Sequence, residues 1–293
     1  MGSELTNASK IPEYEVEPGV NVPRYAIEAG LYGKRFVLMS HWSDSFYDVI
    51  LREDVVELEL NHGKFWPGDR IDFVSELTHL QALILVHLHF RDTGPVQRLH
   101  ELRYVQIGTY ESDPIDFSNF PRLEQCLIEW SPALSSAIKV KSLRRFAVNR
   151  LPADMVVPLG DLTGLRDLSI LSCSATSLDA LRSLTLLQSL RLARFRQLES
   201  NAFLQSLRHL KHLWIQACSG FHSLEPLRSL LALECIWLED LGQVESMLPL
   251  SGLVNLRDLA IGGKTVLLDD SASCISDLPK LERLVLKRRR RRR

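Results

Sequence analysis

The nine residues LRHLKHLWI, Leu207 to Ile215, decide the fold, because their pattern LxxLxxLxL recurs along the chain. Good copies also begin at residues 77, 99, 162, 184, 230, 253 and 278, and weaker copies begin at 120 and 140. An irregular first copy, VVELEL, covers residues 55–60. A pattern that returns this often predicts a chain built from one repeated structural unit.

The spacing of the copies is nearly constant. The penultimate apolar residue of each copy marks its repeat, and the markers are Leu58, Leu83, Val105, Cys126, Phe146, Leu168, Leu190, Leu213, Ile236, Leu259 and Leu284. Successive markers are 20 to 25 residues apart. A unit of this length cannot bury its apolar face alone, so the spacing predicts a solenoid of stacked units.

Each copy combines two local periodicities. The alternation LxL at its end predicts a short strand whose two leucines both point inward. Leucines three residues apart, as in LDALRSL (178–184) and LEPLRSL (224–230), predict a helical or 3₁₀ turn on the opposite side. The stacked strands then form one parallel sheet. Because strands pack more closely than helical turns, the sheet is expected to line the concave face.

The repeat resembles that of the leucine-rich repeat family over roughly residues 55–287. The resemblance implies an α/β solenoid, a curved horseshoe with its parallel sheet on the concave face and short 3₁₀ or α turns on the convex face. The family usually carries asparagine five residues after the marker, where this chain has Cys173 and Cys218 in two repeats. Apolar side chains take that position elsewhere, at Leu88, Tyr110, Leu151, Phe195 and Leu241. The short repeats are similar to the 22-residue, intracellular type that is common in bacterial proteins.

The ends of the chain differ from the repeats. Residues 1–24 are polar and proline-containing, and we expect a flexible or draped arm. Residues 25–54 are expected to form an N-terminal cap, in which RFVLMSHW (35–42) and SFYDVILRED (45–54) pair as an antiparallel hairpin. About eleven repeats follow over residues 55–287. The arginine tail, 288–293, has three interpretations: an added tag, a nucleic-acid or targeting patch, and a solvated end.

Composition excludes several classes of protein. The chain has 293 residues, with 35 Lys and Arg against 36 Asp and Glu, and its net charge is −7 without the six terminal arginines. This acidic body argues against nucleic-acid binding. The five cysteines form no CxxC pair, MGSELTNASK contains no secretory segment, and no apolar run approaches the length of a membrane span. We therefore expect a reduced, cytoplasmic protein without a membrane segment.

The sequence offers no arrangement of residues that predicts catalysis. It lacks the motifs GxGxxG, GxxxxGK[ST], GxSxG and HExxH. His87 and His89 flank the end of one expected strand, with His79 nearby, and strand ends account for them better than a metal site does. Asp269 and Asp270 fit a solvated turn. We therefore predict no catalytic residues, no metal and no cofactor, and a protein that is not an enzyme.

The concave face carries the candidate binding residues. In the repeat frame, the residue after each marker points out of the sheet, and Trp214 and Trp237 occupy this position in adjacent repeats, after Arg191. Exposed tryptophan beside arginine is typical of a binding hot spot. The predicted partner-binding residues are Trp214, Trp237, Arg191, His212, Gln216, Glu239, Arg145, Arg166 and Tyr104. Two alternatives are that residues 1–24 or a long loop cover the tryptophans, and that curvature of the sheet lets neighbouring side chains shield them.

The favoured functional hypothesis is a non-enzymatic, monomeric module that binds a protein partner on the concave face. An arginine-rich middle in an acidic body predicts a partner with an acidic patch. A narrower version, by family analogy, is an immunity or inhibitor protein that holds a toxin or enzyme. The alternatives are a nucleic-acid or phospholigand binder that uses the arginine-rich mid-face and tail, and a self-associating structural protein.

Overall fold

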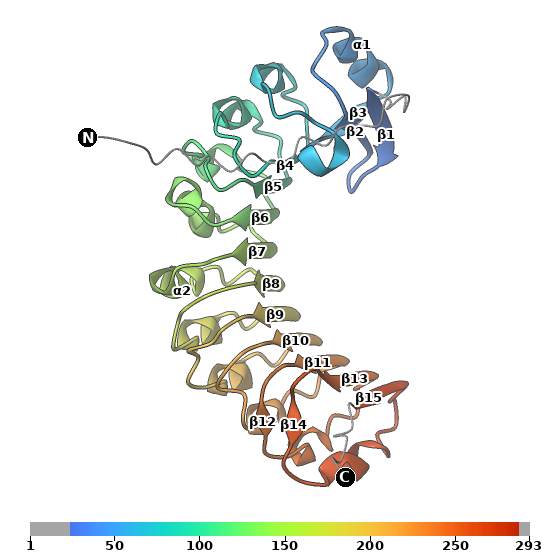
Figure 1. The fold of residues 1–293 in the computed structure, drawn as a ribbon, viewed down its shortest axis with the longest axis vertical. Helices are drawn as coiled ribbons and strands as arrows, with labels where there is room; N and C mark the ends of the chain where they lie inside the picture. Colours follow the sequence, from blue (N-terminus) through green and yellow to red (C-terminus); the bar gives the residue numbers. More distant parts are fainter. Residues whose placement is uncertain (1–23, 287–293) are drawn as a thin grey trace, which may run out of the picture.

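The computed structural model describes residues 24–286, which form a curved solenoid (Figure 1). The expected N-terminal arm, up to residue 23, and the arginine tail, 288–293, lie outside the described residues. Within these residues, thirteen strands form one sheet, in the order β1-β2-β3-β4-β5-β6-β7-β8-β9-β10-β11-β13-β15. Their bounds are β1 Tyr25–Ala29, β2 Lys34–Leu38, β3 Val55–Asn61, β4 Ala82–Val86, β5 Tyr104–Gly108, β6 Gln125–Glu129, β7 Arg145–Asn149, β8 Asp167–Ile170, β9 Ser189–Ala193, β10 His212–Gln216, β11 Cys235–Glu239, β13 Asp258–Gly262 and β15 Arg283–Leu286. A separate short pair consists of β12 Gln243–Val244 and β14 Val266–Leu267.

The strand register confirms the repeat frame. From β3 onward the strands of the long sheet run parallel, and every marker residue pairs with the marker of the next repeat. Leu58 pairs with Leu83 at one end, and Leu259 pairs with Leu284 at the other. The alternation of the LxL pattern sets this register, since a slip of one residue would turn every leucine out of the core.

Short helical segments close each repeat on the outer curve (Figure 1). Two are α-helices, α1 Ser45–Arg52 and α2 Val156–Leu159. The others are 3₁₀ helices at His62–Lys64, Asp72–Glu76, Gly94–Arg98, Phe117–Asn119, Pro132–Lys139, Ala153–Met155, Asp179–Ser183, Ala202–Ser206, Glu225–Leu227, Leu248–Leu250 and Ser271–Ile275. Leucines from the turns and strands fill one continuous core between the two layers. None of the helices in residues 24–286 is long and apolar enough to cross a membrane.

The N-terminal cap contains an antiparallel hairpin, but one of its predicted strands is wrong. The hairpin pairs β1 with β2, so residues 25–29, and not residues 45–54, supply its other strand. Residues 45–52 instead form α1, which buries Phe46 and Ile50 on one face. These two residues are four apart in the sequence, a spacing that places both on one face of a helix. The local alternation of the same stretch also fits a strand, so the pattern alone does not decide between the two. β2 then joins β3 in parallel and continues the long sheet.

The positions that hold asparagine in the family are filled in different ways. Cys173 and Cys218 are buried, and the Cys218 thiol donates to the carbonyl oxygens of Gln216 at 3.3 Å and Leu192 at 3.6 Å. Leu151 and Phe195 are buried as core residues. Tyr110 lies at the surface, 41% exposed. Thiols and apolar side chains therefore occupy interior positions at which the family has a ladder of asparagine amides.

Candidate functional site

Three side chains stack along the concave face on neighbouring strands. Arg191 lies on β9, Trp214 on β10 and Trp237 on β11, and the strand register places them opposite one another. The two indole rings are stacked, with centroids 4.9 Å and planes 12° apart. The guanidinium carbon of Arg191 lies 4.3 Å from the centroid of the Trp214 ring. We call these three residues the aromatic ladder.

The aromatic ladder keeps part of its surface open and leaves two donors unused. All three side chains are half-buried. Within the described chain, Trp214 Nε1 and Arg191 Nε are buried and have no hydrogen-bond partner. Stacking fixes the rings and the guanidinium in one arrangement, which presents a preorganised apolar surface with a positive charge at one end.

Three other predicted residues border the aromatic ladder. His212 is exposed at the start of β10. At the opposite ends of their strands, Gln216 Nε2 donates to Glu239 Oε2 at 3.0 Å. On β13, the next strand of the sheet, Ala260 pairs with Trp237. Its side chain is small and buried, so the row of large side chains ends there. The structure thus brings six of the predicted residues together on β9, β10 and β11.

Tyr104 lies apart from this group and is 8% exposed. It packs with Ala82 and Ile84, and Tyr32 from the loop between β1 and β2 lies against the same cluster. The Arg103 guanidinium stacks over the Tyr32 ring at 4.4 Å, and Gln125 Nε2 donates to the Tyr32 hydroxyl at 3.1 Å. The cap therefore covers the concave face near Tyr104, which leaves this residue little surface for a partner.

The acidic residues of the first repeat are covered as well. Glu57 is fully buried, and its carboxylate accepts from Arg35 Nη2 at 2.9 Å. Glu59 is 4% exposed and pairs with Lys64 Nζ at 3.1 Å. Alternation along β3 puts both glutamates on the strand face, but alternation alone could not show that the hairpin loop lies over Glu57 and that Arg35 and Lys64 pair with Glu59.

The remaining predicted residues, Arg145 and Arg166, are exposed in the middle of the solenoid. Arg145 lies on β7, where Nη1 donates to Gln125 Oε1 at 3.2 Å and Nη2 lies 3.9 Å from Asp167 Oδ2. Arg166 precedes β8, at the edge where the strands begin. Neither residue lies on the strands of the aromatic ladder.

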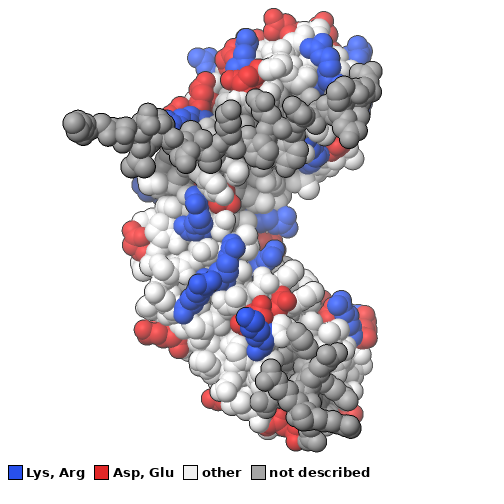
Figure 2. Space-filling model, in the orientation of Figure 1, with Lys and Arg blue, Asp and Glu red and all other residues white. Residues whose placement is uncertain are grey.

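Positive charge is concentrated in the middle repeats. Residues 141–210 carry ten Lys and Arg against five Asp and Glu, a net charge of +5. Figure 2 shows basic side chains running across the middle of the molecule. Among residues 24–286, six arginines of this segment form no ion pair with a carboxylate: Arg144, Arg166, Arg191, Arg194, Arg196 and Arg208. The excess charge of this segment is therefore not neutralised within the described chain.

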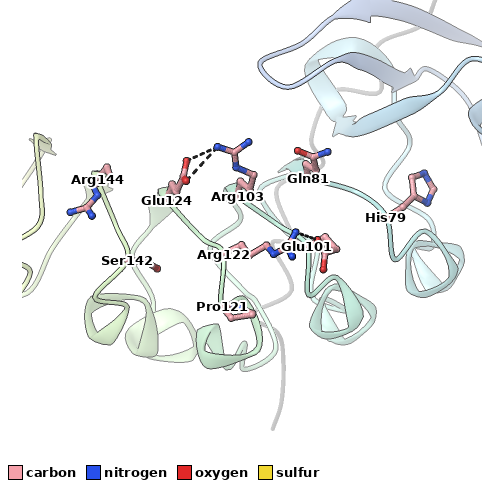
Figure 3. Close-up of a pocket in the computed structure, with 9 residues that line it drawn as sticks. All are labelled: His79, Gln81, Glu101, Arg103, Pro121, Arg122, Glu124, Ser142 and Arg144. Atoms are coloured by element: carbon pink, nitrogen blue, oxygen red, sulfur yellow. Dashed lines mark hydrogen bonds and ion pairs between the residues drawn. The ribbon is translucent and has the colours of Figure 1, made fainter.

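A groove of about 480 Å³ lies along the edge where the strands begin (Figure 3). Most of the charged side chains that line the groove form ion pairs with one another. Arg103 Nη2 lies 3.1 Å from Glu124 Oε2, and Arg122 pairs with Glu101. Arg144 donates from Nη1 to the carbonyl oxygen of Gly164 at 3.0 Å. The groove thus offers a ligand few unused charges.

Burial shifts the pKa values of two titratable side chains on or near the strand face, Cys235 and His87. Burial raises the pKa of the Cys235 thiol, and the Asp258 carboxylate raises it further. Burial lowers the pKa of His87, and the nearby His62 and His89 lower it further. In the part of the chain that the structure describes, no three His, Cys, Asp or Glu side chains gather in a way that could hold a metal ion.

The fold resembles those of bacterial repeat proteins. An internalin from Listeria monocytogenes matches with a TM-score of 0.63 and 21% sequence identity, over 80% of this chain and 68% of the internalin chain. An LRR protein of Leptospira interrogans matches with a TM-score of 0.59 and 15% identity, over 85% of this chain and 66% of its own. No protein-family model and no curated protein sequence matches the chain. The chain therefore has the leucine-rich repeat fold, as its repeat pattern, its parallel sheet and its likeness to these two structures all indicate.

Proposed function

We propose that the protein is a non-enzymatic module that binds a protein partner on its concave face, with the aromatic ladder as the hot spot. The single observation that carries this proposal is the stack of Arg191, Trp214 and Trp237 on a face that the cap leaves open. Tryptophan and arginine are the residues most enriched at binding hot spots. His212, Gln216 and Glu239 supply a polar border around them.

The charge of the middle repeats supports the same proposal. Arg191 of the aromatic ladder is one of six arginines there that form no ion pair with a carboxylate among residues 24–286. The surplus positive charge of the middle repeats favours a partner with an acidic surface. A regulator or inhibitor that holds its target in the hollow is a specific form of this proposal.

The proposal also takes the protein to be cytoplasmic and monomeric. All five cysteines are free thiols, which fits a reducing compartment. Light scattering of the wild-type chain and of a Trp214→Ala, Trp237→Ala variant distinguishes a monomer from self-association through the ladder. If the wild type is a dimer and the double variant is a monomer, the ladder binds a second copy of the chain and not a different protein.

The proposal predicts that Trp214→Ala with Trp237→Ala weakens partner binding by more than about 2 kcal/mol. The test captures proteins from the native host's lysate and then measures the affinity of the purified partner by calorimetry. Leu231→Ala is the matched control, because Leu231 is 56% exposed and precedes β11 in the same repeat as Trp237, off the strand face. Equal affinity for the wild type and the tryptophan variant would remove the ladder from the binding site.

A further inference from the structure

The edge where the strands end contains a pocket with unused donors. Its volume is about 330 Å³, and it lies between the loops that follow β8 and β9. The lining residues are Ser172, Cys173, Ser174, Arg194, Arg196 and Gln197. None of them is acidic. This pocket therefore differs from the groove at the opposite edge, where carboxylates pair with the arginines.

The two arginines of the pocket have no carboxylate to neutralise them. Among residues 24–286, neither Arg194 nor Arg196 forms an ion pair, and both side chains are exposed. They lie in the segment 141–210, whose net charge is +5. A negatively charged ligand would meet two guanidinium groups there without having to displace a protein carboxylate.

Arg194 is held in place before any ligand arrives. Its Nε donates to the carbonyl oxygen of Leu171 at 2.9 Å, and its Nη2 donates to Asn149 Oδ1 at 3.4 Å. Its backbone has a φ of 61°, in the left-handed region. The same position of other repeats shares this conformation, at Arg150, Ala217, Asp240 and Gly263. The turn of the repeat thus fixes where the Arg194 side chain begins, and two acceptors orient its guanidinium group.

The donor set matches a phosphoryl group. Two guanidinium groups, the hydroxyls of Ser172 and Ser174 and the amide of Gln197 can all donate hydrogen bonds, and a guanidinium fork fits phosphate oxygens in pairs. A phosphate monoester carries a charge near −2 and three acceptor oxygens at neutral pH. We propose that this pocket binds the phosphoryl group of a phosphate monoester. The site is separate from the aromatic ladder and does not depend on the protein partner proposed above.

Calorimetry with the full chain tests the site. The probes are phenyl phosphate, inorganic phosphate and a short neutral peptide that contains one phosphoserine, all at the same ionic strength and pH. We expect saturable binding of phenyl phosphate. The double variant Arg194→Gln, Arg196→Gln should weaken it at least tenfold. Arg208→Gln is the matched control, because it removes an exposed, unpaired arginine of the same segment outside the pocket, and it should change the affinity less than twofold.

Two further variants keep the result interpretable. Arg196→Gln alone removes an exposed side chain, so it tests the site even if the loss of Arg194 disturbs the turn. Trp214→Ala with Trp237→Ala should bind phenyl phosphate as the wild type does, which separates this site from the partner surface. If the phosphopeptide binds more tightly than phenyl phosphate and inorganic phosphate, the natural ligand is a phosphorylated protein. If the probes bind equally tightly, the natural ligand is a small molecule. Equal weakening by Arg208→Gln and by the double variant, or no saturable binding of any probe, would overturn the proposal.

Discussion

Glu57 is the residue whose surroundings differ most from the expectation of an open strand face. Alternation along β3 places it on the concave side, and the cap then buries it completely. Its carboxylate accepts from Arg35 Nε at 3.0 Å and from the backbone N–H of Tyr32 at 2.5 Å. A side chain at Gly30 would collide with this carboxylate, so the loop approaches Glu57 as closely as glycine allows. One buried charge thus fixes the hairpin loop to the first repeat.

Replacing Glu57 by Gln should therefore destabilise the protein by about 2 kcal/mol, because the charge-assisted hydrogen bonds from Arg35 and from the Tyr32 N–H are weakened and Arg35 keeps only Glu59, at 3.5 Å, as a buried partner. Urea unfolding followed by circular dichroism measures the change. Glu53→Gln is the control, since Glu53 forms an exposed pair with Lys34 and should leave stability nearly unchanged. Similar unfolding midpoints for Glu57→Gln and the wild type would show that this pair does not hold the cap.

At the scale of elements, the loop between β1 and β2 divides the concave face into a covered and an open part. Tyr32 from this loop reaches across to Arg103, before β5, and to Gln125 on β6. The face over the first repeats is therefore internal to the protein. The strands from β9 to β11, which carry the aromatic ladder, lie beyond its reach. Among residues 24–286, the cap thus covers the concave face of the first repeats and leaves that of the later repeats uncovered.

Substitutions of Tyr32 should separate its two contacts. Tyr32→Phe removes only the hydroxyl that accepts from Gln125 and should lower stability by about 1 kcal/mol. Tyr32→Ala also removes the ring beneath Arg103 and uncovers Ile84, and should cost about 2 kcal/mol. Thermal unfolding measures both values. The affinity for the partner should not change in either variant. A loss of affinity would show that the binding surface also includes the cap.

At the scale of the whole molecule, one continuous core contains or borders ionisable groups that the folded protein keeps neutral. Burial raises the pKa of the Cys126 thiol. Burial also raises the pKa of Cys218 from its ordinary value of 9.0 to about 11. Burial, with the charge of Glu76, raises the pKa of Tyr47 from 10.0 to about 12. Each group ionises more readily in the unfolded chain than in the folded one.

Stability should therefore fall at alkaline pH. A raised pKa in the folded state contributes stability that is fully present below the unfolded pKa, near 9.0 for a thiol, and that is lost as the pH rises to about 11. The urea midpoint should be flat from pH 7 to 9 and then decline. Cys126→Ala should unfold more easily at pH 7 but decline less steeply above pH 9. A midpoint that rises between pH 9 and 11 would contradict this account.

The repeat pattern alone determined the fold. A period of 20 to 25 residues leaves stacking as the only way to bury the leucines, and the LxL alternation sets a register in which every marker meets the next. The same frame placed Trp214 beside Trp237 and Arg191 beside Trp214. Local pattern could not separate helix from strand at residues 45–54, because spacings of two and of four both fit a short apolar run.

Only the tertiary structure decided which parts of the concave face are open. Burial of Tyr104 and Glu57 depends on a loop that precedes them and folds back across the sheet, and no periodicity encodes such a contact. The pocket around Arg194 and Arg196 likewise joins two loops about twenty residues apart in the chain. Sequence fixes the direction of a side chain relative to its own strand, whereas its exposure depends on what the rest of the chain places over it.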